Sequence, residues 1–83
     1  MSHTPHELHA EFPADVAMLH ELKVSDPHYR SLSEQYHEVN REIHRIEAEV
    51  DPATDARLED LKKQRLSMLD EVAEMLAKAK AAA

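Results

Sequence analysis

Histidine is the residue type in this sequence that most readily suggests chemistry, because imidazole binds metal ions and titrates near neutral pH. Seven histidines occur, and His3, His6 and His9 repeat every third residue. At that spacing, imidazoles on one helix face can share a metal ion. No H-E-x-x-H pair accompanies them, which favours a solvated surface rich in His over a metal site. We therefore assign no metal-binding residue, and metal sensing through these histidines stands as an alternative function.

Positive charge gathers at one place in the sequence, Lys62-Lys63-Gln64-Arg65, directly after Glu59 and Asp60. The net charge of the whole chain is −7, and no third of it is basic. Because phosphate contacts dominate affinity for nucleic acids, this balance argues against a nucleic-acid partner. A further alternative function is nucleic-acid association by an oligomer that clusters Lys62, Lys63 and Arg65.

Several kinds of active site are excluded by composition. The sequence has no Cys and no Gly, which removes thiol catalysis, thiolate metal sites, P-loops and dinucleotide-binding loops. We expect no catalytic residue, no cofactor and no enzyme activity. No apolar run approaches the ~20 residues that cross a membrane, and the N-terminus lacks the features of a signal peptide. A cytoplasmic location without membrane contact is therefore expected.

Four prolines divide the chain into the elements that must position these side chains. Proline is tolerated at the first position of a helix, where its missing N–H has no intrahelical partner. The sequence predicts one helical domain over 1–83: a tail or short helix over 1–11, a helix over 13–24, and helices over 27–50 and 52–80. Asp26 is expected to cap the third element, and Asp51 or Thr54 the last.

The last two helices carry apolar seams whose spacing alternates between three and four residues, the heptad pattern of packed helices. Pairing outward from the connection matches Ile43 with Leu61 and Tyr36 with Met68, and every pair has the same sum of residue numbers. The pattern predicts an all-α fold, a long antiparallel coiled-coil-like hairpin with a short N-terminal helical segment folded against it. The seam consists of Tyr29, Leu32, Tyr36, Val39, Ile43, Ile46, Leu58, Leu61, Arg65, Met68, Val72 and Met75.

Arg65 interrupts the second seam with a charge. A polar seam residue can fix the register of two helices, and the predicted register brings Asn40, Glu42 and the Tyr36 hydroxyl within reach of its guanidinium. We favour this structural role over binding of an anion or a partner's carboxylate.

A second apolar stripe, made of Leu66, Leu69, Ala73 and Leu76, runs beside the seam of the last helix. In the predicted register it lies level with the first half of helix 27–50. We interpret it as a docking face, covered either by the helix over 13–24 or by another chain.

Eight short stretches have a recognisable order and spacing: His6-Glu7-Leu8-His9, Glu11-Phe12-Pro13, Leu22-Lys23, Ser25-Asp26-Pro27-His28-Tyr29, Tyr36-His37-Glu38-Val39-Asn40, Glu42-Ile43-His44-Arg45-Ile46-Glu47, Lys63-Gln64-Arg65-Leu66 and Asp70-Glu71. Through them the chain resembles the YdcH family of small bacterial proteins, grouped as domain of unknown function 465. The resemblance implies a long α-hairpin in a cytoplasmic bacterial protein, and it brings no known activity, cofactor or catalytic residue.

These observations together predict a non-enzymatic protein-interaction or adaptor module that acts through helix faces. Its expected partner is an unidentified protein, a second copy of the chain, or both.

Overall fold

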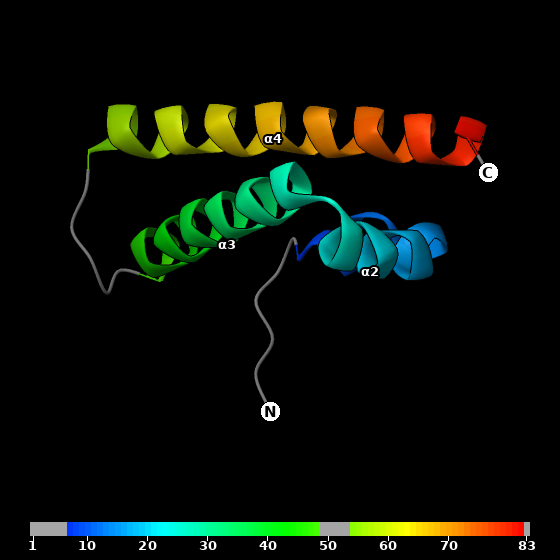
Figure 1. The fold of residues 1–83 in the computed structure, drawn as a ribbon. Coiled ribbons are helices and arrows are strands. Elements are labelled where there is room, and N and C mark those ends of the chain that lie inside the picture. Colours follow the sequence, from blue (N-terminus) through cyan, green and yellow to red (C-terminus); the bar gives the residue numbers. More distant parts are fainter. Residues whose placement is uncertain (1–6, 49–53, 83) are drawn as a thin grey trace.

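The computed structural model describes residues 7–48 and 54–82, and these residues are helical with no β-strand among them (Figure 1). The α-helices are α1 (Leu8–Glu11), α2 (Val16–Ser25), α3 (Pro27–Glu47) and α4 (Asp55–Ala82), with a 3-10 turn over Pro13–Asp15. The all-α class predicted from the sequence is confirmed. None of the described helices is both long and apolar enough to span a membrane.

The break between α2 and α3 is held by side chains at both helix ends. The Asp26 carboxylate accepts hydrogen bonds from the backbone N–H groups of His28 at 2.9 Å and Tyr29 at 3.2 Å, with Pro27 in the first turn. The Arg30 guanidinium donates to the backbone carbonyls of Lys23 and Val24 at the end of α2. The predicted Asp26 cap is confirmed, and it satisfies backbone N–H groups that have no partner within α3.

The other helix ends differ from the predicted bounds by a few residues. The α-helix expected from residue 13 begins at Val16, because the Asp15 N–H bonds to the Phe12 carbonyl in a tighter turn. The Thr54 hydroxyl accepts a hydrogen bond from the Arg57 N–H at 3.1 Å and so caps α4. The alternative cap, Asp51, lies outside the described residues, as do the predicted last residues of helix 27–50.

Helices α3 and α4 pack against each other and run in opposite directions (Figure 1). Polar pairs join the two helices near both ends of α3, where His28 meets Glu71 at 3.4 Å and Glu47 meets Lys62 at 3.1 Å. Of the predicted seam, Tyr29, Leu32, Tyr36, Ile43, Leu61 and Val72 are buried, and Val39, Ile46, Leu58, Arg65, Met68 and Met75 are half-buried.

Helix α4 is longer than α3 and continues past its start to lie along α2 (Figure 1). The N-terminal segment is therefore part of the core. Leu8 of α1 and Leu19 of α2 are buried in the same cluster as Tyr36 and Val72. Burial of one such Leu side chain stabilises a fold by about 1.5–3 kcal/mol, so α1 and α2 are docked by packing within the chain.

Candidate interaction surface

The second stripe is divided between core and surface. Leu76 is buried in the cluster that contains Leu8 and Leu19, and Leu69 packs half-buried against that cluster. Ala73 is exposed, and Leu66 is 61% exposed. The chain's own N-terminal segment shares a core with part of this stripe, which leaves Leu66 and Ala73 as its solvent-facing members.

Helix α2 is apolar on more than one side. Leu19 is buried and Leu22 is half-buried, while Val16 is 47% exposed and Val24 is 71% exposed on its outer surface. Both α3 and α4 contact α2, and among the described residues these contacts leave Val16 and Val24 exposed.

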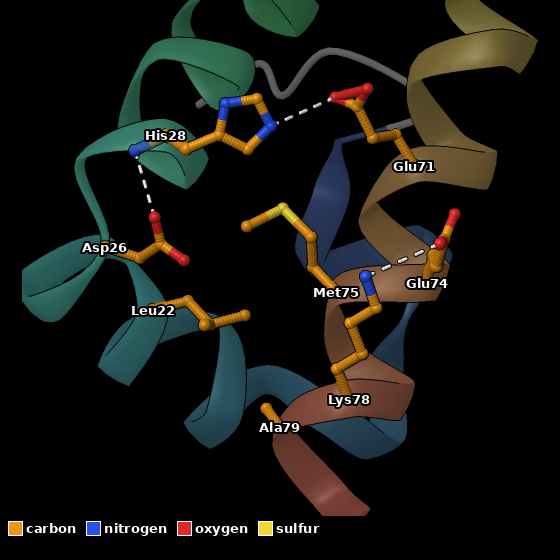
Figure 2. A pocket seen from close by; sticks show the side chains of 8 residues that line it. All are labelled: Leu22, Asp26, His28, Glu71, Glu74, Met75, Lys78 and Ala79. Carbon is orange, nitrogen blue, oxygen red and sulfur yellow. Dashed lines mark hydrogen bonds and ion pairs between the residues drawn. The ribbon is translucent and has the colours of Figure 1, made fainter.

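A groove of about 580 Å³ lies where α2, the start of α3 and the end of α4 meet (Figure 2). We call it the α2–α4 groove. Leu22 and Met75 extend toward each other across it, and Ala79 lies at its far end. It is lined by Leu22, Asp26, His28, Glu71, Glu74, Met75, Lys78 and Ala79.

A neighbouring hollow of about 520 Å³ shares Leu22 and Ala79 with the groove. It is further lined by Met18, Glu21, Val24 and others on α2, and by Ala82 at the end of α4. The two hollows together give α2 and α4 a connected surface that is open to solvent and on which aliphatic side chains lie among polar and charged ones.

The polar pairs along the α2–α4 groove are weak. His28 Nε2 lies 3.4 Å from a Glu71 carboxylate oxygen, and Lys78 Nζ lies 3.6 Å from a Glu74 oxygen (Figure 2). All four side chains are largely exposed, and exposed pairs contribute about 0–1 kcal/mol each. These pairs therefore leave the groove accessible and its carboxylates available to other cations.

A more buried polar cluster lies beneath the N-terminal segment. Arg65 Nη1 donates to Asn40 Oδ1 at 3.1 Å, one of the contacts that the predicted register allowed, and Asn40 is 2% exposed. Burial, together with the carboxylates of Glu11 and Glu7, raises the pKa of Tyr36 to about 12, and the Arg65 guanidinium opposes this rise. The cluster ties α3 to α4 and is partly buried, and we assign it to support of the fold.

The residues of the alternative metal and nucleic-acid sites are either dispersed or outside the described residues. His3 and His6 fall outside the described residues, and within them no three His or carboxylate side chains are placed to hold a metal ion. His37 Nδ1 instead meets a Glu7 carboxylate oxygen at 3.1 Å. Of the basic cluster, Lys62 pairs with Glu47 and Arg65 with Asn40.

The α2–α4 groove was not foreseen in the sequence, because Leu22 and Ala79 belong to different helices with no shared periodicity. The available signal was the composition of α2, in which Val16, Met18, Leu19, Leu22 and Val24 fall on several sides of the helix.

Comparison with known proteins identifies a family but no characterised relative. A family model described as "Protein of unknown function (DUF465)" matches residues 30–76, which include most of α3 and much of α4. No curated protein and no solved structure matches the chain.

Proposed function

The chain belongs to the DUF465 family of proteins of unknown function, and on that premise we propose that it is a non-enzymatic protein that binds another protein through its helix faces. The observation that carries this proposal is the apolar surface of α2 beside α4, where Val24 is 71% exposed next to a groove of about 580 Å³.

The shape of this surface suits a helical ligand. Helix-in-groove recognition uses an apolar floor that accepts side chains spaced three and four residues apart. Leu22, Met75 and Ala79 supply such a floor, with α2 and α4 as its walls. The ten residues of α2 extend over about 15 Å at 1.5 Å per residue. That length accommodates two to three turns of a bound helix.

An adaptor needs a second surface in addition to this groove. Leu66 and Ala73 are exposed on α4 and do not line the groove. We assign the second contact of an adaptor to them. Single apolar residues on a surface are common in monomeric proteins, so the groove remains the principal site of the proposal.

The test is photocrosslinking in the native cell with a photoreactive residue in place of Val24. The same residue in place of Glu59, which is exposed near the start of α4, serves as the control. We expect one defined protein to be crosslinked from position 24 and not from position 59. Mass spectrometry identifies the product.

A matched pair of substitutions shows whether the groove itself is used. Ala79→Gln places a longer polar side chain on the floor of the groove. Ala77→Gln makes the same change at an exposed position of α4 that lines neither hollow. The crosslink should be lost in Ala79→Gln and kept in Ala77→Gln, with both variants equally helical by circular dichroism. Identical crosslinking in both, or none from position 24, contradicts the proposal.

A further inference from the structure

We propose that the ligand of the α2–α4 groove is a basic amphipathic helix of a partner protein. Its apolar side chains would contact Leu22, Met75 and Ala79, and its Lys or Arg side chains would reach the carboxylates at the rim. This inference rests on the proposed function and specifies the chemistry of the partner.

Carboxylates from three elements surround the apolar floor. Glu21 lies on α2, Asp26 at the start of α3, and Glu71 and Glu74 on α4. The only Lys or Arg that lines the groove or the neighbouring hollow, among the described residues, is Lys78. The rim therefore has an excess of negative charge around aliphatic side chains, and this arrangement complements a helix with one apolar and one basic face.

The other side of α2 differs in its charged residues. The hollow between α1, α2 and α3 is lined by Lys23 and three histidines, and no carboxylate lines it. Its lining consists of Leu8, His9, Val16, Leu19, His20, Lys23, Tyr29, Ser33 and His37. The acidic rim is thus a property of the α4 side of α2 and does not merely reflect the acidic composition of the chain.

The existing pairs at the rim oppose binding very little. Glu71 is held by His28 and Glu74 by Lys78, at 3.4 and 3.6 Å, between side chains that are largely exposed. Pairs of this kind contribute at most about 1 kcal/mol. An incoming ammonium or guanidinium group can replace either His28 or Lys78 without first breaking a strong interaction.

Charge distinguishes this ligand from a second copy of the chain. Each copy carries a net charge of −7, and a two-fold contact through this groove places the acidic rim of one copy against that of the other. Like charges in contact are unfavourable. A basic helix converts the same carboxylates into attractive contacts and is also attracted from a distance.

The experiment uses a fluorescein-labelled amphipathic peptide of Leu and Lys, and a matched peptide in which Glu replaces every Lys. Fluorescence anisotropy measures the binding of each peptide to the full chain. We expect the Lys peptide to bind at least tenfold more tightly than the Glu peptide, with an affinity that falls as salt is added. Ala79→Gln should weaken it at least tenfold, whereas Ala77→Gln should leave it unchanged.

Charge reversal isolates the role of the rim. One variant carries Glu71→Lys with Glu74→Lys, and the control carries Glu34→Lys with Glu59→Lys at exposed positions outside the groove. Both variants have the same net charge. We expect the Glu71 and Glu74 variant to weaken binding of the Lys peptide at least tenfold more than the control variant does. Equal weakening would mean that the peptide responds to net charge alone, and this result overturns the inference.

Two further outcomes separate this inference from the proposed function. If Ala79→Gln abolishes the crosslink in the cell while reversal at Glu71 and Glu74 leaves peptide binding unchanged, the groove binds a protein that is not a basic helix. If sedimentation velocity detects a dimer that Ala79→Gln removes and Ala77→Gln retains, the groove binds a second copy. Either result overturns the basic-helix inference, whereas the proposed function is overturned only if position 24 gives no specific crosslink or if Ala79→Gln and Ala77→Gln crosslink identically.

Discussion

Alkaline pH should destabilise this protein through Tyr36. Its side chain is 0% exposed, and burial together with the nearby carboxylates of Glu11 and Glu7 raises its pKa to about 12. In an unfolded chain the phenol titrates near pKa ~10. The folded state therefore holds the Tyr36 proton over a range in which the unfolded state releases it.

The size of the effect follows from this difference of about two pKa units. Below pH ~10 both states are protonated and Tyr36 contributes no pH dependence. Above pH ~10 the unfolded state gains free energy by losing the proton, so stability falls with rising pH until the folded state also titrates near 12. Between pH ~8 and ~11 the free energy of unfolding should decrease by about 1.4 kcal/mol through Tyr36.

Urea unfolding followed by circular dichroism measures this change in the native chain and in Tyr36→Phe. Lysines also titrate in this range, but they are the same in both proteins, so the difference between the two isolates Tyr36. A direct measurement is the near-ultraviolet absorbance of tyrosinate, because the chain has two Tyr and no Trp. Burial also raises the pKa of Tyr29, against the effect of its hydrogen bond with Ser33. Both tyrosines should therefore titrate above their usual pKa in the folded state.

The role assigned to Tyr36 is refuted if Tyr36→Phe loses as much stability between pH ~8 and ~11 as the native chain does. The same role is refuted if both tyrosines of the folded protein titrate near pKa ~10.

Three further substitutions test the packing and the cap. Ile43→Asp, at a side chain that is 1% exposed, should lower stability by several kcal/mol, because it buries a charge in the α3–α4 seam; an unchanged melting temperature would contradict a core position. Asp26→Ala should cost about 1 kcal/mol in urea unfolding, because it removes the acceptor at the start of α3; an unaltered midpoint would show that the cap is not needed. Leu69→Glu should loosen α2 and leave α3 and α4 helical. Hydrogen exchange should then be faster over residues 16–25 only. Uniformly faster exchange throughout the chain would contradict an effect confined to α2.

Local signals account for the parts of the fold that the sequence predicted. The start of α3 depends on Asp26 and Pro27, which are adjacent in the chain, and the Thr54 cap acts on an N–H three residues away. The regular alternation of apolar residues in α3 likewise makes one side of that helix apolar and directs it toward the core. The contact between Arg65 and Asn40 was predictable because the two seams have matching spacing over several turns.

The covering of the second stripe depended on contacts between distant residues. Leu76 and Leu66 belong to one predicted stripe, yet Leu76 is buried with Leu8 and Leu19 while Leu66 is exposed. The stripe itself is continuous in the sequence. The position at which the N-terminal segment packs along α4 decides which of its residues are covered, and the sequence pattern of α4 contains no information about that position.

The sequence by itself determined the two long helices, the Asp26 cap and the packing of α3 against α4, because each depends on periodicity or on residues a few positions apart. Only the tertiary structure decided where α2 lies and, with it, the α2–α4 groove. Apolar residues lie on several sides of α2, so its own sequence pattern does not select the side that is buried. Contacts with both α3 and α4 selected that side, and they leave Leu22, Met75 and Ala79 around an open groove.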